Sequence, residues 1–537
     1  VNGGGTVMIF QQIGRLVRAL SRSCAVSGGA LLMVGCAADK PVETYDYLIS
    51  GGMVYDGTGT AGAIVDIGIS DGRIAYIGTA RHVAGRVVVD AQGLVVAPGF
   101  IDPHTHSLED LTSTERRQNL NYLTQGVTTV FTGNDGYGPT DIARTLKTLD
   151  EGGVGTNVGL YVGHGAVRAQ VMKAESRAAT DAEAAQMTSL VSSAMEQGAF
   201  GLSTGLFYAP GSFASTQEVT NLARAVAPFC GIYDSHIRDE STYTVGLQAA
   251  VQEAIDIGRD AGVPTHIAHI KALGADVHGM SGDIIQLVEK ARAQGLDVTA
   301  DQYPWLASGT SVAASLVPRW AMAGGREAMA ARLRQADEKL LSEMAENLRR
   351  RGGPASLLLV GGDPAWQGKT LADMAQAWQV PALEAALRIV LEGDARVASF
   401  NMKEEDVINF MQQPWVMTGS DGSTGHPRKF ATYPQKYERF VLGKPVLTLA
   451  DFIRKSSGLV ADALNITERG YLRPGYWADI VVLDLAQYHA NATYRAPEEL
   501  TTGVQYLFVN GRLAINEGKA GDVLSGMALR HDTSGCQ

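Results

Sequence analysis

Short apolar runs alternate with amphipathic stretches through the centre of the chain, and eight of these runs end at a polar or ionisable residue. Alternation of this kind predicts βαβ units and a parallel sheet. The predicted strands end near His106, Asn134, His164, Thr204, His236, His269, Tyr303 and Asp421. In a (β/α)8 barrel, the carboxyl ends of the strands converge on the face that holds the active site. We therefore predict an α/β fold with a (β/α)8 TIM barrel over residues 98–430.

A different pattern flanks the predicted barrel. Short β-prone runs broken by Gly and Asp fill residues 43–97, and similar runs return within residues 431–529, after the last barrel helix region. These runs predict strands, and we expect a small β-sandwich domain formed from both ends of the chain. The gap between the seventh and eighth barrel strands is too long for one βα unit. It predicts an insertion at about 312–400, which we expect to cover the barrel mouth as a lid.

The N-terminal segment, residues 1–36, has the pattern of an export signal. Three arginines, at positions 15, 18 and 22, precede a short apolar stretch that ends at Gly35 and Cys36. A basic region before a short apolar core is typical of a signal peptide, and the stretch is too short to span a bilayer. The Gly35–Cys36 pair resembles a bacterial lipobox; the alternatives are an ordinary signal peptide and a start assigned too early. We expect an exported bacterial protein, periplasmic or a membrane-anchored lipoprotein.

Charge and cysteine content narrow the classes of partner. The net charge is −11, without long runs of one sign. Nucleic acids and anionic membranes require a basic surface, so we expect no nucleic acid partner and membrane contact only through an N-terminal lipid anchor. A small molecule is the expected partner. The four cysteines are far apart and lack CxxC spacing, so their spacing predicts neither a disulfide framework nor a cysteine zinc site.

Four histidines at three predicted strand ends form the first chemical signal. His104 and His106 are two residues apart in Pro98–His106, so in a strand their side chains point the same way. His236 and His269 end the fifth and sixth predicted strands. Imidazole is a good zinc ligand, and several imidazoles converging on one barrel face predict a metal site.

Two further residues accompany this set. Asp421, in Thr418–Gly422, ends the eighth predicted strand. An aspartate beside a water that a metal activates can take its proton and pass it to a leaving amine; the alternative is an aspartate that caps a turn before Gly422. Lys271 alternates with His269 and either faces the site or pairs with a carboxylate.

Taken together, these motifs resemble those of the N-acyl-D-amino-acid deacylase (D-aminoacylase) family of the amidohydrolase superfamily, from Tyr47 to about Leu529. Pro98–His106, the two histidines of strands five and six, and Asp421 match the superfamily. The motifs that match the deacylase branch are Gly201–Pro210 (GLSTGLFYAP), His236–Glu240 (HIRDE), Gly425–Arg428 (GHPR) and Gly475–Asp479 (GYWAD). The resemblance implies zinc-dependent hydrolysis of the amide bond of N-acyl-D-amino acids, giving a carboxylate and a free D-amino acid.

The resemblance also implies the roles of the metal-site residues. His104, His106, His236 and His269 become ligands of one or two Zn²⁺ ions, and Asp421 becomes the catalytic base. The family usually has a cysteine where this chain reads Gly133–Gly136 (GNDG), and we expect Asp135 to take its place as a metal ligand. The alternative is an Asp135 that binds no metal. A carboxylate is a harder ligand than a thiolate, so the change bears on metal preference and occupancy.

Substrate binding is implied by a second set of residues. Arg428 is the first candidate for binding the substrate carboxylate, and Arg238 is the second, because a guanidinium suits bidentate carboxylate binding. Tyr303 matches a family tyrosine that can donate to the oxyanion or the substrate; alternatively it packs above the barrel. His164, at strand three, is expected to shape the pocket.

Two other functions fit the same sequence. One is another amidohydrolase activity on the same site, as a D-specific dipeptidase, a cyclic amidase or a lactonase. The other is a non-catalytic surface-anchored binding protein that kept the fold. The altered residue in GNDG is the feature that favours the second, whereas four histidines with Asp421 argue for an enzyme.

Overall fold

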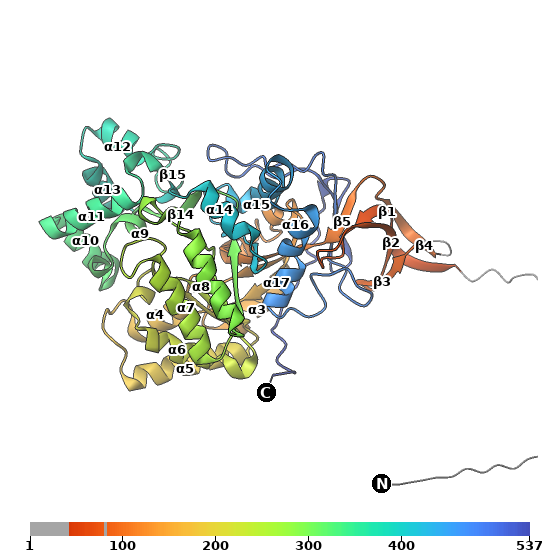
Figure 1. Cartoon of the computed structure of the whole chain (residues 1–537), viewed down its shortest axis with the longest axis horizontal. Coiled ribbons are helices and arrows are strands. Elements are labelled where there is room, and N and C mark those ends of the chain that lie inside the picture. Colours follow the sequence, from red (N-terminus) through yellow and green to blue (C-terminus); the bar gives the residue numbers. More distant parts are fainter. Residues whose placement is uncertain (1–41, 80–82, 537) are drawn as a thin grey trace, which may run out of the picture. The chain divides into compact units, whose positions relative to one another are not determined.

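The computed structural model describes residues 42–79 and 83–536, so the predicted signal segment, residues 1–36, lies outside the described residues (Figure 1). Parallel strands form the barrel in two hydrogen-bonded runs, β6-β7-β8 and β9-β10-β11-β12-β13-β17. Their bounds are β6 Phe100–Thr105, β7 Val127–Thr132, β8 Asn157–Leu160, β9 Val162–Gly163, β10 Gly201–Gly205, β11 Ile232–His236, β12 Thr265–Ile267, β13 Val298–Gln302 and β17 Val416–Thr418. Only Tyr161 separates β8 from β9, and a parallel bridge from Thr105 to Gly422 joins the first strand to the segment after the last. The predicted TIM barrel is confirmed.

Helices cover the barrel where apolar residues recur at helical spacing. In α7 (Leu247–Ala261) the buried positions recur every three or four residues, and Gly262 ends the helix with a φ of 72°, the left-handed conformation that favours glycine. Thr180 and Glu183 form a capping box at the start of α5 (Asp181–Glu196). The other barrel helices are α3 Ile142–Gly152, α4 His164–Met172, α6 Thr216–Arg224, α8 Ser281–Ala293, α14 Glu404–Gln412, α15 Arg428–Tyr437, α16 Leu449–Ser456 and α17 Gly458–Ala463. Within the described part of the chain, none of the helices has the length and apolarity needed to cross a membrane.

Strands from both ends of the chain form a second sheet, as expected. Its strands are β1 Glu43–Val54, β2 Ala63–Ser70, β3 Arg73–Gly78, β4 Val83–Asp90, β5 Val95–Pro98, β18 Ile480–Leu483, β19 Val504–Val509, β20 Arg512–Asn516 and β21 Lys519–Ala520. They form one continuous nine-stranded sheet in which β5 pairs antiparallel with β18, so that Pro98 lies opposite Ile480. Gly99 alone links β5 to β6. A Cβ at Gly99 would lie 2.3 Å from Thr128, so the close approach of the two chain segments requires glycine there.

The insertion between the last two barrel strands forms a unit with its own core. β14 (Ala307–Ser311), β15 (Leu357–Leu359) and β16 (Arg396–Phe400) make a small antiparallel sheet in the order β14-β16-β15. The accompanying helices, drawn as a group in Figure 1, are α9 Val312–Leu316, α10 Gly325–Gln335, α11 Glu338–Arg350, α12 Leu371–Trp378 and α13 Ala382–Leu391. Their apolar faces share a buried cluster that includes Leu316, Met344 and Ile389. We refer to residues 307–400 as the lid.

A disulfide joins the loop before β11 to the C-terminal tail. Cys230 and Cys536 are bonded, although they are 306 residues apart in the sequence. The spacing of the cysteines did not predict this bond, because only the fold brings the tail back beside β11. On the way, the tail pairs with barrel strand β8, where Val158 bridges to Ala528.

Candidate metal centre and active site

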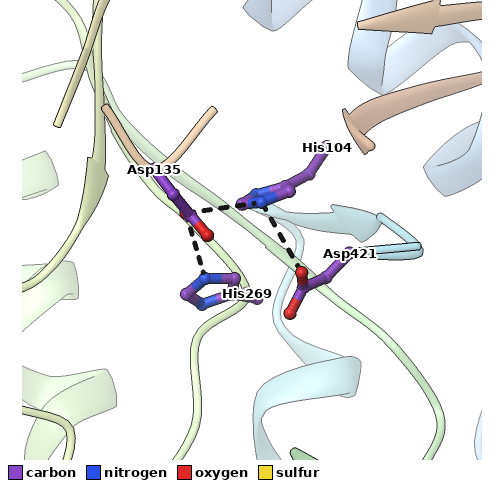
Figure 2. A group of neighbouring side chains, drawn as sticks. All are labelled: His104, Asp135, His269 and Asp421. Carbon is purple, nitrogen blue, oxygen red and sulfur yellow. Dashed lines mark ion pairs between the residues drawn. The ribbon is translucent and has the colours of Figure 1, made fainter. Parts of the chain in front are cut away.

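The predicted ligands meet at the carboxyl ends of five barrel strands. His104 lies in β6 and His106 just beyond it, His236 is the last residue of β11, and His269 follows β12 by two residues. Asp135 follows β7 and Asp421 follows β17. Figure 2 shows His104, Asp135, His269 and Asp421 pointing toward one another, with Asp135 facing two of the imidazoles. The structure therefore brings all six predicted metal-site residues together.

The Asp135 carboxylate lies at the centre of this group. Its Oδ1 is 3.4 Å from His104 Nε2, 3.5 Å from His236 Nδ1 and 3.4 Å from His269 Nε2. Its Oδ2 is 3.5 Å from His106 Nε2. One carboxylate thus faces all four imidazoles, in the position that a bridging ligand would occupy.

The donor set fits a metal ion. Ligand atoms of a tetrahedral site with metal bonds of about 2.0–2.1 Å lie about 3.3 Å apart, close to the separations around Asp135. Both ring nitrogens of His104, His236 Nε2 and Asp135 Oδ1 are buried without a hydrogen bond to any described residue. Buried polar atoms are rarely left without a partner, and a cation among them would satisfy Asp135 Oδ1 and His104 Nε2 together.

Three of these residues adopt an unusual backbone conformation. Asp135, His269 and Asp421 have φ values of 57°, 37° and 46°, in the left-handed region that non-glycine residues seldom occupy. Strained conformations of this kind cluster at functional sites, where the surrounding structure holds them. Here the strain turns each side chain toward the common centre at the end of its strand.

Two buried carboxylates, Asp301 and Asp102, contact the histidines through their ring nitrogens or backbone N–H groups. Asp301, at the end of β13, accepts from the His269 backbone N–H at 2.9 Å and lies 3.0 Å from His266 Nε2 and 3.8 Å from His104 Nδ1. Asp102 Oδ1 accepts from the backbone N–H groups of His104 and Ser420. Outer carboxylates of this kind orient metal-binding imidazoles. His266, which lies beside Asp301, belongs to this supporting layer.

Asp421 lies between a histidine and an arginine. Its Oδ1 is 3.1 Å from His106 Nε2, and its Oδ2 is 2.8 Å from Arg428 Nη2. Burial alone would raise the pKa of the Asp421 carboxyl, but the Arg428 guanidinium and His269 outweigh burial and hold that pKa below its usual range. The carboxyl group is therefore in its charged form, which is the form that a general base requires.

Lys271 both faces the site and pairs with a carboxylate, the two alternatives that the sequence left open. Its ammonium lies 2.5 Å from Glu240 Oε1 and 2.7 Å from His269 Nδ1, and it also lines the cavity. Burial would raise the pKa of the Glu240 carboxyl, but Lys271 and His236 hold it well below its usual value. Glu240 was not among the predicted site residues, although it lies in the HIRDE motif.

The centre opens into a cavity of about 1070 Å³. His106, Asp135, His236, His269 and Asp421 line it on the barrel side. The lid supplies Ser308–Ser311, Ala314, Arg351 and Arg396 to the same cavity, as expected of a segment over the barrel mouth. Sequence reasoning placed the lid there but did not identify Arg351 and Arg396.

Arg428 and Tyr303 lie against the reacting end of this cavity. The Arg428 guanidinium lies 4.7 Å above the Tyr303 ring. Arg428 Nε and Nη1 and the Tyr303 hydroxyl are buried and have no hydrogen-bond partner among the residues that the structure describes. Both side chains line the cavity, and these three donors are left unsatisfied in the described structure.

The structure does not place Arg238 and His164 in the cavity, which corrects the expectation for both. Arg238 Nε and Nη2 bind the Glu253 carboxylate at 2.8 Å, and Nη2 also donates to the Ala214 carbonyl. His164 Nε2 lies 3.1 Å from Glu218 Oε1. Carboxylates from the neighbouring helices α7 and α6 satisfy both side chains, so neither belongs to the described cavity lining.

Comparisons with known proteins agree with this geometry. A sequence model described as amidohydrolase family matches residues 87–515. D-aminoacylase from Alcaligenes xylosoxydans xylosoxydans is 34% identical over 498 residues, which cover 87% of this chain and 94% of the relative. N-acyl-D-aspartate deacylase from the same organism is 31% identical, covering 91% of this chain and 96% of the relative.

Solved structures resemble the whole described fold. The crystal structure of a D-aminoacylase has a TM-score of 0.78 at 30% identity, covering 90% of this chain and all of that one. N-acyl-D-glutamate deacylase from Bordetella bronchiseptica, complexed with zinc and a phosphonate inhibitor that mimics the tetrahedral intermediate, has a TM-score of 0.77 at 31% identity. This match covers 91% of this chain and all of that one.

Proposed function

The chain belongs to the amidohydrolase family, and from this premise we propose that it is a zinc-dependent hydrolase of N-acyl-D-amino acids. It cleaves the amide bond and releases a carboxylate and a free D-amino acid. One observation carries the proposal: Asp135 faces four imidazoles at 3.4–3.5 Å, beside Asp421, in a cavity that also holds Arg428. The high-coverage relatives named D-aminoacylase and N-acyl-D-aspartate deacylase support the substrate class.

The metal is held by His104, His106, His236, His269 and Asp135, with Asp421 beside them. A bound divalent ion such as zinc polarises the amide carbonyl and makes a water molecule acidic near neutral pH. The residues offer enough donors for one or two ions. Elemental analysis of the purified protein, with zinc, cobalt and nickel measured together, tests both identity and number.

Asp421 performs the proton transfers. Its carboxylate takes a proton from the attacking water while the water oxygen bonds to the amide carbon. The same proton then passes from Asp421 to the amide nitrogen as the carbon–nitrogen bond breaks. Arg428 keeps Asp421 ionised before the reaction, and the unpartnered Tyr303 hydroxyl is placed to donate to an oxygen of the substrate.

Arg428 also binds the α-carboxylate of the substrate in this proposal. Its Nη2 is engaged by Asp421, but Nε and Nη1 remain without a partner in the described structure. Each of these N–H groups can donate a charge-assisted hydrogen bond to a carboxylate oxygen. The substrate carboxylate would thus lie next to the catalytic carboxylate, which places the scissile nitrogen within reach of Asp421.

A substrate panel tests the proposed function. Zinc-loaded protein is assayed for amine release from N-acetyl-D-methionine, its L-enantiomer and D-containing dipeptides, and for ring opening of hydantoins and lactones. We expect turnover of the N-acyl-D substrate and a kcat/KM at least tenfold lower for the L-enantiomer. Turnover of dipeptides, cyclic amides or lactones without any N-acyl-D-amino acid would overturn the proposal.

We also propose that the protein is exported. The basic and apolar pattern of residues 1–36 motivates this, and the Cys230–Cys536 disulfide is typical of proteins from oxidising compartments. Lipid attachment at Cys36 is part of the proposal. Fractionation of expressing bacteria, with Cys36→Ser as the comparison, tests both parts of this proposal. The wild type should be in the membrane fraction and the variant in the soluble fraction outside the cytoplasm. A wild-type protein that stays in the cytoplasm without a lipid would contradict the proposal.

A further inference from the structure

Three arginines approach the cavity along the lid strand β14. Arg351 Nη1 donates to Ser308 Oγ at 3.3 Å. Arg428 Nη2 lies against Gly309, where an added Cβ would come within 2.8 Å of it. Arg396, the first residue of β16, pairs in register with Ser311, the last residue of β14. All three arginines line the cavity, so this wall is strongly cationic.

The positive charge on this wall exceeds the negative charge that pairs with it. Arg428 forms an ion pair with the Asp421 carboxylate. Arg351 has only neutral partners, the Tyr243 hydroxyl at 2.5 Å and Ser308. Within residues 42–79 and 83–536, no carboxylate lies within ion-pair distance of Arg351 or Arg396, and the Arg396 guanidinium makes no hydrogen bond. Other lid arginines, Arg349 and Arg388, do have carboxylate partners at the surface.

Unpaired cations in a closed cavity are costly to the folded protein. Arg351 is 2% exposed and Arg396 is half-buried, and buried charges without partners are strongly disfavoured. Burial and the nearby Arg428 lower the pKa of the Arg396 guanidinium. An anionic group beside Arg396 would relieve both its burial and its repulsion by Arg428, and the unpartnered Arg396 guanidinium can offer a carboxylate two N–H donors.

We propose that Arg396 binds a second carboxylate of the substrate, so that the enzyme prefers N-acyl derivatives of acidic D-amino acids, D-aspartate or D-glutamate. The proposal rests on the proposed function, in which Arg428 binds the α-carboxylate. Since Arg428 touches the same strand β14, the second carboxylate belongs to the amino-acid part of the substrate and therefore to its side chain.

The other charged residues of the cavity support this assignment. Glu109 and Glu115, from the segment after β6, and Glu498, from the segment before β19, line the cavity away from β14 in sequence and are exposed. Arg116 and Lys429 line the same region, but both pair with Asp110, so carboxylates outnumber cations there and would repel a carboxylate carried on the acyl group. An acidic side chain on the amino acid, by contrast, would meet the unpaired guanidinium of Arg396.

The experiment compares matched substrates that differ in one charge. kcat/KM is measured for N-acetyl-D-glutamate against N-acetyl-D-glutamine, and for N-acetyl-D-aspartate against N-acetyl-D-asparagine. We expect the wild type to favour at least one acid over its amide by tenfold or more. Arg396→Gln should reduce that ratio at least tenfold, chiefly through KM, while Arg388→Gln, a lid arginine paired with Glu384, should keep it.

The possible results distinguish a failure of this inference from a failure of the proposed function. Equal kcat/KM for acids and amides in the wild type overturns this inference and leaves the proposed function standing, whereas no turnover of any N-acyl-D substrate overturns the proposed function itself. If Arg396→Gln instead impairs N-succinyl-D-leucine and spares N-acetyl-D-glutamate, the second carboxylate is on the acyl side and the inference is wrong. Should Arg396→Gln fail to fold, inhibition of the wild type decides: glutarate must inhibit at least tenfold better than butyrate.

Discussion

Arg428 Nη2 lies 2.8 Å from Asp421 Oδ2, while the other oxygen of the same carboxylate faces His106. The two oxygens of Asp421 therefore have different neighbours: one is held by a permanent cation and the other points to the metal site. Because Arg428 is the proposed partner of the substrate carboxylate, substrate binding and proton transfer depend on one guanidinium. This relationship leads directly to the first two predictions.

Replacing Asp421 by Asn should abolish turnover without unfolding the protein. The amide keeps the size of the side chain but cannot take the proton of the attacking water. We expect kcat to fall by about 10²–10⁴-fold, the usual contribution of general acid–base catalysis. Rates are measured with N-acetyl-D-methionine, and thermal unfolding serves as the control. A variant that is folded, metal-loaded and active to within a few-fold would remove Asp421 from the mechanism.

Replacing Arg428 by Lys should weaken substrate binding even though the charge is kept. A lysine is a point charge and cannot engage Asp421 and a substrate carboxylate with separate, fixed donors. We expect kcat/KM for N-acyl-D-amino acids to fall by about 10²-fold, since a charged hydrogen bond contributes about 1.5–3 kcal/mol. The control is Lys429→Arg, at the neighbouring position, where the wild-type ammonium contacts Asp110. A steady-state comparison of the two variants checks that the effect belongs to position 428.

Replacing Asp135 by Ala should cost both metal and activity. The carboxylate that faces four imidazoles disappears, leaving their nitrogens without a central ligand. Zinc content and turnover are measured on the same samples, with Asp135→Cys as the conservative variant. We expect the thiolate to restore zinc binding. Full metal content in Asp135→Ala would show that Asp135 is not a ligand; His489→Ala, an exposed histidine paired with Glu438, controls for adventitious metal.

The buried lysine Lys455 should make stability depend on pH. Its ammonium donates to the Val416 carbonyl at 2.9 Å, and burial lowers its pKa to about 8, against about 10.4 in an unfolded chain. Between these values the unfolded chain binds more protons, so stability rises with pH. Relative to Lys455→Met, the wild-type free energy of unfolding should increase by about 1–3 kcal/mol from pH 8 to 10.5. Denaturant titrations at pH 8 and 10.5 measure this change, and a constant or shrinking difference between the two proteins would contradict the prediction.

Barrel and metal site could be predicted from sequence because their signals are local. Strands buried on both faces are continuous apolar runs, and each ligand lies within a few residues of the end of such a run. His104 and His106 lie two residues apart at the end of one strand, so their alternation alone indicates convergence. The position of Asp421 followed from the same rule, whereas Asp135 was identified through the resemblance of GNDG to the family's cysteine motif; the positive φ values of both could not be read from the sequence.

Side-chain partners that come from distant segments could not be predicted. Arg238 and His164 follow barrel strands as the ligands do, but Glu253 and Glu218 on neighbouring helices bind them instead. Arg396 lies in the lid, in a strand whose pairing with β14 sets its place in the cavity. Cys230 and Cys536 are a third case, since their contact depends on the path of the whole tail.

The antiparallel pairing of β5 with β18 has a consequence for the order in which this protein is made. His104 and His106 emerge from the ribosome early, on a strand whose base is joined to β5 by a single glycine. The strand that lies beside β5 is translated only when the chain is almost finished. A nascent chain that stops short of residue 480 thus carries His104 and His106 without the strand that pairs with β5. All six residues of the metal site, of which Asp421 is the last in the sequence, are synthesised before the sheet beneath the first of them can be completed.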